Sequence, residues 1–210
     1  MKNDAIIFDI DGTLWDACPA SAKGWNEGLK KLGIEGEVTA LQVKNVAGRP
    51  QKECIEIILP GLQKTYPYLF EILDVSENEA VKAKGGIIYD GVVEGIKKLA
   101  KSHKIFIVSN CTAWYLDLFL NFSGLKPVLS GCDCNGISNL SKGNMLARMK
   151  NKFSLKNPVY IGDTASDEEA AGSAEMEFIH VSYGFGKSKG EAKTFDSFSD
   201  LTDYFIAGNG

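Results

Sequence analysis

The sequence predicts an α/β fold in which a parallel sheet is covered by helices on both faces and a helical unit is inserted near the start. Three short apolar runs, at residues 5–8, 105–108 and 159–161, are rich in β-branched and aromatic side chains. Such runs are typical of parallel strands that are buried on both faces. From residue 85 onward, apolar runs of this kind alternate with amphipathic helical patterns. This alternation favours a parallel sheet between two layers of helices.

The insertion is predicted because the sequence changes from strand-like to helical patterns after the first strand. Residues 20–82 contain no apolar run typical of a buried strand, but several stretches have apolar residues at helical spacing. Trp25, Leu29 and Leu32 share one helical face that ends before Gly33, and an apolar face at residues 68–73 precedes a helix that we expect to start at Ser76. We therefore expect a helical unit over residues 17–84 and a core formed by residues 1–16 and 85–210.

The core elements are expected in a regular order after the insertion. Residues 85–86 and 16–19 are the expected hinges between the two units. Helices are predicted near residues 91–102 and 114–122, and the apolar spacing of Trp114, Leu118 and Phe122 indicates a helix face buried in the core. Short strands are predicted near residues 128–129, 159–161 and 178–181.

The composition is that of an ordinary soluble protein and excludes several classes of function. The chain has 210 residues, 44% of them hydrophobic, and a net charge of −4 with no basic block, so neither nucleic acid nor an anionic membrane is an expected partner. No apolar stretch has membrane-spanning length. The first strand follows Met1 closely, so we expect no signal peptide, a cytoplasmic location and five reduced cysteines. No oligomeric state is predicted.

Two pairs of carboxylates follow predicted strands. Asp9 and Asp11 come directly after the first strand, and residues two apart point to the same side of a strand. Asp163 and Asp167 follow the strand at residues 159–161. The carboxyl ends of parallel strands form the ligand-binding edge of an open sheet. Four carboxylates there would repel one another without a hard cation, and Mg²⁺ prefers oxygen ligands and often retains a substrate phosphate.

Phosphate-binding groups are predicted from two further positions. Ser109 and Asn110 follow the strand at residues 105–108, and Lys142 lies at the start of an apparent helix. A hydroxyl, exposed amides and an ammonium group are suited to phosphoryl oxygens. The glycine-rich segment at residues 184–188 ends like a phosphate-binding loop but lacks the required first glycine, so a nucleotide-binding function is disfavoured.

This ordered series of motifs resembles the haloacid dehalogenase-like superfamily, and in particular its phosphoglycolate phosphatase-like branch with a helical cap. The series consists of DxDGT at residues 9–13, Ser-Asn at 109–110, Lys142 and GDxxxD at 162–167. The resemblance covers nearly the whole chain. It implies a Rossmann-like core, a cap formed by residues 17–84, and a phosphoric monoester hydrolase.

The resemblance also implies a role for each motif residue. Asp9 would attack phosphorus and form an aspartyl phosphate, while Asp11 would protonate the leaving group and then activate water. Ser109, Asn110 and Lys142 would bind the phosphoryl group. The implied Mg²⁺ ligands are the side chains of Asp9 and Asp163, the backbone carbonyl of Asp11, and Asp167 as a ligand or an outer partner.

Several of these positions have simpler interpretations. Ser109 is also typical of a turn after a strand, Lys142 of a surface lysine at a helix start, and Asp167 of a charge favoured by a helix dipole. Arg49 lies in a segment, residues 46–50, that resembles a cap loop facing the core. It could bind a carboxylate or second phosphate of the substrate, or it could be an ordinary surface arginine. The mixed charges at residues 77–84 indicate a solvated helix face.

The predicted function is Mg²⁺-dependent hydrolysis of a small phosphorylated metabolite. The alternative is a sugar phosphomutase, similar to beta-phosphoglucomutase, which would use the same core residues and return the phosphoryl group to a substrate. Dehalogenases and phosphonate-cleaving members of the superfamily lack an acid at the position of Asp11, so both are disfavoured. A non-catalytic binding module is disfavoured because the motif carboxylates are all present.

Overall fold

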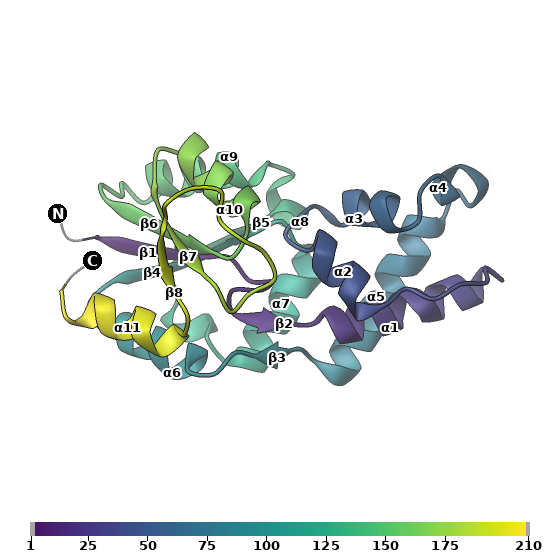
Figure 1. Ribbon diagram of the computed structural model, residues 1–210, viewed down its shortest axis with the longest axis horizontal. Helices are drawn as coiled ribbons and strands as arrows, with labels where there is room; N and C mark the ends of the chain where they lie inside the picture. The colour runs from purple at the N-terminus through teal and green to yellow at the C-terminus, as the bar shows by residue number, and fades with distance from the viewer. Residues whose placement is uncertain (1–2, 209–210) are drawn as a thin grey trace.

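The computed structural model describes residues 3–208 and consists of a parallel sheet between two layers of helices, with a helical unit extending from one end (Figure 1). The sheet order is β5-β4-β1-β6-β7-β8, and all its strand pairs are parallel. Its strands are β1 (Ala5–Phe8), β4 (Lys104–Ser109), β5 (Gly131–Cys134), β6 (Pro158–Gly162), β7 (Glu177–Val181) and β8 (Lys193–Phe195). The predicted α/β class is confirmed.

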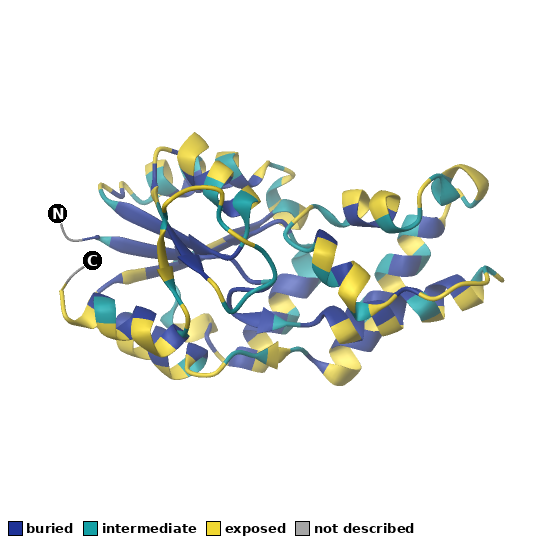
Figure 2. Cartoon of the chain, viewed as in Figure 1, coloured by how far each residue is buried: buried dark blue, intermediate teal, exposed yellow. Residues whose placement is uncertain are grey.

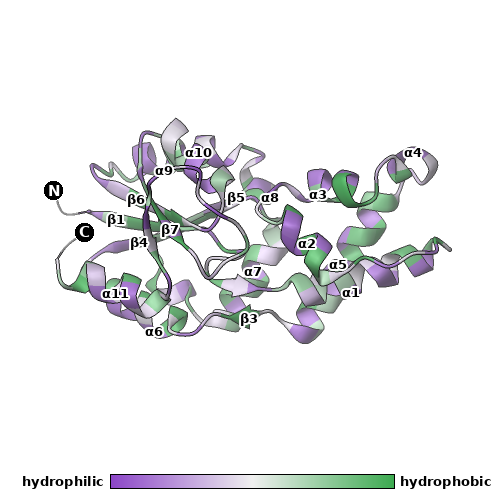
Figure 3. Ribbon diagram, viewed as in Figure 1, coloured by the Kyte–Doolittle hydropathy of each residue, from purple (hydrophilic) through white to green (hydrophobic). Residues whose placement is uncertain are grey.

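The central strand β1 shows why the strand sequences are apolar without alternation. Ile6 and Phe8 pack into the hydrophobic core on one face of the sheet, while Ala5 and Ile7 pack into a second core on the other face. Because both faces are covered, every residue of β1 is buried, and its neighbours β4 and β6 are buried along almost their whole length (Figure 2). The hydropathy colouring follows the same pattern, with apolar strands between helices of mixed character (Figure 3).

Within residues 3–208, five helices and two short helical segments complete the core. One face of the sheet packs against α6 (Val92–Leu99), α7 (Ala113–Ser123) and α11 (Phe198–Ile206). The other packs against α9 (Lys142–Lys152) and α10 (Ala165–Ser173). The short segments are a 3-10 helix (Lys126–Val128) and α8 (Asn135–Ser138).

The strand predicted near residues 128–129 is wrong. This position belongs to the 3-10 helix, which contains Pro127, and the strand β5 begins only at Gly131. The sequence of β5 is Gly-Cys-Asp-Cys, so it lacks the apolar run that identifies the inner strands. It forms the edge of the sheet and pairs with β4 alone.

The helical unit lies between two short strands, β2 (Trp15–Asp16) and β3 (Ile87–Ile88), which pair antiparallel as a ribbon. Its helices are α1 (Cys18–Lys31), α2 (Ala40–Val46), α3 (Gln51–Ile58), α4 (Leu62–Thr65) and α5 (Leu69–Lys84). They enclose a hydrophobic core of their own, which includes Trp25, Leu29 and Leu73. We call this helical unit the cap.

The long helices α1 and α5 pack against each other at very short range. A Cβ atom at Gly24 would lie 2.5 Å from the Cα atom of Glu77, so only glycine permits this approach. The predicted helix start at Ser76 is wrong, because α5 runs without a break from Leu69 to Lys84 and Ser76 is buried within it. Among residues 3–208, no helix is both long and apolar enough to cross a membrane.

Candidate active site

Three buried carboxylates meet at the carboxyl ends of β1 and β6. Asp9 follows β1, Asp163 follows β6, and Asp167 lies in the first turn of α10. One oxygen from each carboxylate lies within 4.8 Å of the others. All three side chains are fully buried, which is costly for charged groups unless they are paired or bind a metal. Asp9 near the start of the chain and Asp163 and Asp167 in its last third are thus brought to one site by adjacent parallel strands.

The carboxylate of Asp163 is fixed by donors from two loops. Its Oδ2 atom accepts hydrogen bonds from the backbone amides of Phe185 at 2.7 Å and Gly186 at 3.3 Å, and its Oδ1 atom accepts one from the Thr13 hydroxyl at 3.3 Å. The turn at Gly12 has a φ of 78°, and a Cβ atom there would lie 2.2 Å from Asp163. The glycine-rich segment after β7 therefore orients the carboxylate of Asp163. The sequence did not indicate this role, since residues 184–188 only resemble an incomplete phosphate-binding loop.

Lys142, at the start of α9, connects Asp9 and Asp167. Its ammonium nitrogen lies 3.0 Å from Oδ1 of Asp9 and 2.6 Å from Oδ1 of Asp167. The other oxygen of Asp167 accepts hydrogen bonds from the backbone amide and hydroxyl of Thr164, at 3.0 Å and 2.6 Å. Both oxygens of Asp167 are thus engaged by protein donors, so this residue is placed to hold Lys142 and to begin α10.

The carboxylate of Asp9 has fewer partners. Both of its oxygens are buried, and neither has a well-formed hydrogen bond within the described chain, although Oδ1 is in ion-pair contact with Lys142. A buried carboxylate oxygen without a donor is an expected binding position for a cation or an electrophile. The donor set of Asp9 and Asp163, with only oxygen ligands, therefore fits a hard ion such as Mg²⁺.

Burial dominates the electrostatics of these groups. It raises the pKa of Asp9 to about 6, against the lowering effect of Lys142, and raises the pKa of Asp163 to about 8, with the charges of Asp167 and Asp9 adding to the shift. Burial alone would lower the pKa of Lys142, but the carboxylates of Asp167 and Asp9 raise it well above its ordinary value. The ammonium group therefore remains charged in the site.

Asp11 points out of this cluster toward the cap. Burial raises its pKa to about 7, while a hydrogen bond from the hydroxyl of Tyr115 on α7 opposes the shift and the nearby charge of Asp9 adds to it. A carboxyl group with a pKa near neutrality can give up and take back a proton at working pH, as general acid–base catalysis requires. Tyr115 was not identified from the sequence.

Ser109 and Asn110 follow β4, but they have different surroundings. Ser109 is buried, and its hydroxyl accepts a hydrogen bond from the amide of Cys111 at 3.4 Å. The side-chain amide of Asn110 instead donates to the backbone carbonyl of Gly48 in the cap at 2.8 Å. Its Oδ1 atom is buried without a partner in the described chain. Asn110 thus connects the core to the cap loop.

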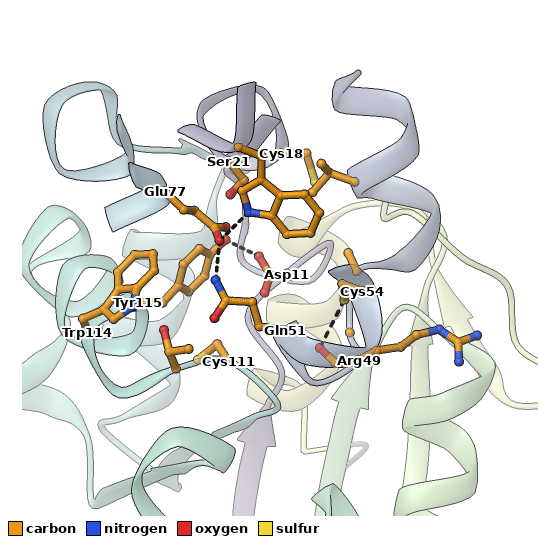
Figure 4. Close-up of a pocket in the computed structure, with 15 residues that line it drawn as sticks. Asp11, Cys18, Ser21, Arg49, Gln51, Cys54, Glu77, Cys111, Trp114 and Tyr115 are labelled. Carbon is orange, nitrogen blue, oxygen red and sulfur yellow. Dashed lines mark hydrogen bonds between the residues drawn. The ribbon is translucent and has the colours of Figure 1, made fainter. Parts of the chain in front are cut away.

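A cavity of about 70 Å³ lies between the core and the cap (Figure 4). Asp11 and Tyr115 line it from the core, and Gln51 and Glu77 line it from the cap. The expectation that residues 77–84 form a solvated face is wrong for Glu77, which is buried and accepts a hydrogen bond from Trp25 Nε1 at 2.7 Å.

The buried helix face expected at Trp114, Leu118 and Phe122 is confirmed only in part. Trp114 and Leu118 are partly buried and pack against the core, and Trp114 also lines the cavity and donates a hydrogen bond from Nε1 to Asp74 at 2.8 Å. Phe122 is 48% exposed, so the expectation is wrong for that residue. The backbone of Arg49 borders the cavity, where its carbonyl oxygen lies 3.6 Å from the Cys54 sulfur, but its side chain is exposed and its guanidinium group points away from the cavity residues (Figure 4).

The family model for haloacid dehalogenase-like hydrolases matches residues 6–181, which include all the carboxylates described above. The chain belongs to this family. A phosphoglycolate phosphatase from Psychrobacter arcticus is 28% identical, with 98% of this chain and 97% of the relative covered. A phosphoglycolate phosphatase from Aquifex aeolicus is 26% identical, with 90% of each chain covered. The family and these relatives support the predicted class of phosphoric monoester hydrolase.

Solved structures of the same fold include two that align over almost the full length. A predicted phosphoglycolate phosphatase from Haemophilus somnus has a TM-score of 0.82 at 21% identity, covering 97% of this chain and 98% of its own. A predicted phosphatase from Clostridium acetobutylicum has a TM-score of 0.81 at 19% identity, covering 99% of this chain and 100% of its own. These likenesses establish the haloacid dehalogenase-like fold for the core and the cap together.

Proposed function

We propose that this family member is a Mg²⁺-dependent phosphatase that hydrolyses a small-molecule phosphate monoester in the cytoplasm through a phosphorylated Asp9. The proposal rests above all on the state of Asp9, a buried carboxylate at the end of β1 with no well-formed hydrogen bond in the described chain. A nucleophile must present an oxygen that is free to form a bond, and the neighbouring ammonium of Lys142 supplies the charge to attract a phosphoryl group.

Asp9 would attack phosphorus while the bond between phosphorus and the ester oxygen breaks. Asp11 would give its proton to the departing alkoxide, so that the product leaves as an alcohol. In the second step Asp11 would take a proton from water, the water oxygen would bond to phosphorus, and the bond to Asp9 would break to release inorganic phosphate. Lys142 and the Ser109 hydroxyl would hold the phosphoryl oxygens during both steps.

Asp9, Asp163 and the backbone carbonyl of Asp11 would hold Mg²⁺, which when bound neutralises the buried carboxylates and the charge of the phosphoryl group. Asp167 would act as an outer partner, because its oxygens already accept hydrogen bonds from Lys142 and Thr164. Asn110 would act through its contact with the cap. Its side-chain Nδ2, the group that can donate to a phosphoryl oxygen, already donates to the carbonyl of Gly48, so Asn110 would bind phosphate only after a change of orientation.

The nucleophile can be tested with Asp9→Asn, which keeps the shape of the side chain. With p-nitrophenyl phosphate as substrate, we expect turnover to fall by roughly 10³-fold or more, because the covalent route is lost. Asp203→Asn, an exposed position on α11, is the matched control and should keep wild-type activity. Circular dichroism of both variants reports folding. Near-native turnover by Asp9→Asn would exclude Asp9 as the nucleophile.

An assay with a sugar phosphate as substrate separates a hydrolase from a phosphomutase. A hydrolase releases one inorganic phosphate for each substrate molecule consumed, whereas a mutase conserves the phosphate ester and needs a bisphosphate primer. We expect stoichiometric release of inorganic phosphate without any primer. Isomerisation of a sugar phosphate without net phosphate release would instead favour the mutase.

A further inference from the structure

The cap side of the cavity carries a buried carboxylate that the catalytic scheme does not use. Glu77 lies on α5 and is 7% exposed, and its Oε2 atom accepts two hydrogen bonds, from Trp25 Nε1 at 2.7 Å and from Gln51 Nε2 at 2.6 Å. The donors come from α1 and α3, so three cap helices fix this one side chain (Figure 4). Such a buried, multiply bonded group is rigid and has a defined position in the cavity.

The cavity supplies no positive charge opposite Glu77. Among the residues that line it within the described chain, Arg49 is the one cation, and its guanidinium group points away from the cavity (Figure 4). Asp11 faces the same space, and Lys142 is engaged by Asp9 and Asp167. Burial raises the pKa of Glu77, and the hydrogen bonds that its carboxylate accepts from Ser21, Trp25 and Gln51 oppose this shift. A second anionic group placed here would meet two carboxyl groups and no free cation, which is unfavourable in a buried site.

Other polar atoms of the cavity wall require hydrogen-bond donors. The Oε1 atom of Gln51 is buried and has no hydrogen-bond partner in the described chain, and the same holds for the hydroxyl of Thr112. Both residues line the cavity. An amide oxygen can only accept, and a hydroxyl can do either, so a ligand that carries O–H groups satisfies both. A carboxylate ligand has no donor for Gln51.

We infer that Glu77 is a specificity-determining residue, which selects phosphate monoesters whose leaving group is an uncharged, hydroxylated carbon chain and rejects leaving groups that carry a carboxylate. The inference rests on the proposed phosphatase function and names its substrate class. The chain would thus differ in preference from the relatives named phosphoglycolate phosphatase.

Two pairs of substrates with nearly the same shape test this selection. Glycerol 3-phosphate and 3-phosphoglycerate form one pair, and 2-hydroxyethyl phosphate and 2-phosphoglycolate form the other; each pair differs by a hydroxymethyl group in place of a carboxylate. For the wild type we expect kcat/KM to favour the hydroxylated member of each pair by roughly tenfold or more, because a carboxylate meets the carboxyl groups of Glu77 and Asp11 without a free cation. A preference for the carboxylate members would overturn the inference.

The variant Glu77→Gln removes the charge and retains an oxygen that can accept from Trp25 and Gln51. We expect it to reduce the preference for the hydroxylated substrates by roughly tenfold, mainly through higher kcat/KM on the carboxylate members. Glu79→Gln is the matched control, since Glu79 lies on the same helix with an exposed side chain paired to Lys31. An unchanged preference in Glu77→Gln would overturn the inference. If this variant fails to fold, the inference is still tested by the wild type, through the ratio of kcat/KM for the two members of each substrate pair.

The assays distinguish failure of the proposed phosphatase function from failure of the inference about Glu77. If the wild type hydrolyses none of the four substrates and no p-nitrophenyl phosphate in the presence of Mg²⁺, then both the phosphatase proposal and the selection fail. If p-nitrophenyl phosphate is hydrolysed but the members of each pair are used equally, the phosphatase proposal stands and only the role of Glu77 is wrong.

Discussion

The hydroxyl of Tyr115 donates a hydrogen bond to the carboxylate of Asp11, although the two residues lie 104 positions apart in the chain. Tyr115 is on α7, the helix that follows β4, and Asp11 follows β1, so adjacent strands bring the pair together. A hydrogen bond to the charged form of a carboxyl group lowers its pKa, and here it partly offsets the effect of burial. Tyr115 is therefore placed to tune the proposed general acid.

Tyr115→Phe should shift the pH dependence of catalysis. The proposed leaving-group step needs protonated Asp11, so kcat/KM for an alkyl phosphate should fall as pH rises through about 7. Loss of the Tyr115 hydrogen bond raises the pKa of Asp11, so this alkaline limb should move to higher pH in the variant. The pH profile of p-nitrophenyl phosphate, whose leaving group needs little protonation, is the control. An alkyl phosphate profile that does not move would argue against this role for Asp11.

Removal of divalent metal should abolish phosphatase activity. We expect no turnover in excess chelator and full recovery on addition of Mg²⁺, with Ca²⁺ a poor substitute because its longer and looser coordination misplaces the reacting groups. A readout without turnover is thermal unfolding, since a ligand at 100 times its Kd stabilises the folded state by about 2.7 kcal/mol. Mg²⁺ should raise the Tm of the wild type but not of Asp163→Asn. Activity that persists in chelator contradicts the metal site.

Asp167→Asn should lower stability, because it removes one of the two carboxylates that compensate buried Lys142. We expect the free energy of unfolding to decrease by about 3 kcal/mol, the lower end of the range for a broken buried ion pair, since Asp9 remains as a partner. Urea-induced unfolding measures this change. Glu169→Gln, which removes an exposed ion pair with Lys189, should cost less than about 1 kcal/mol. Equal losses in both variants would mean that Asp167 does not compensate Lys142.

Asn110→Ala should weaken closure of the cap, because it removes the hydrogen bond to Gly48. A neutral hydrogen bond contributes roughly 0.5–1.5 kcal/mol, so kcat/KM for an alkyl phosphate should fall by roughly two- to tenfold. Limited proteolysis near residues 85–86 should become faster. The alternative is that Asn110 binds phosphate directly. In that case Asn110→Ala would weaken inhibition by inorganic phosphate by a larger factor than it changes the rate of proteolysis.

Arg49→Ala should have little effect on substrate selection. The side chain is exposed and its guanidinium points away from the cavity, so a change of kcat/KM within about twofold is expected for anionic and neutral substrates alike. Kinetics on 2-phosphoglycolate and p-nitrophenyl phosphate measure it. A selective loss on 2-phosphoglycolate would restore Arg49 as an anion-binding residue and place its guanidinium in the site when substrate is bound.

The sheet and its carboxylates were predictable because their signals are local. An apolar run followed by Asp9 identifies a buried strand and the group at its end within a few residues, and Asp163 has the same kind of signal. The edge strand β5 was misplaced because its sequence, at residues 131–134, is not apolar and its position depends on pairing with β4. Local patterns thus identify the inner strands better than the edge.

The cap wall of the site was not predictable in the same way. Glu77 lies in a stretch of mixed Glu and Lys residues, which is typical of a solvated helix face. Its burial is possible because Trp25 and Gln51, each on another helix, donate hydrogen bonds to it. The sequence of α5 alone gives no sign of these donors. Tyr115 was missed for the same reason, since its partner Asp11 is distant in sequence. Arg49 had a suitable charge, but its orientation depends on the packed loop.

The ribbon formed by β2 and β3 has a consequence for how such proteins can diversify. The chain leaves the core along one strand of this ribbon and returns along the other, so the two points where the cap is joined lie side by side. A segment of almost any length could be spliced between them without separating β1 from its sheet neighbours, since the entropy of loop closure rises only slowly with length. The cap can therefore be replaced as a unit. Inserting a different cap between Asp16 and Ile87 offers a route to new substrates while the catalytic core stays unchanged.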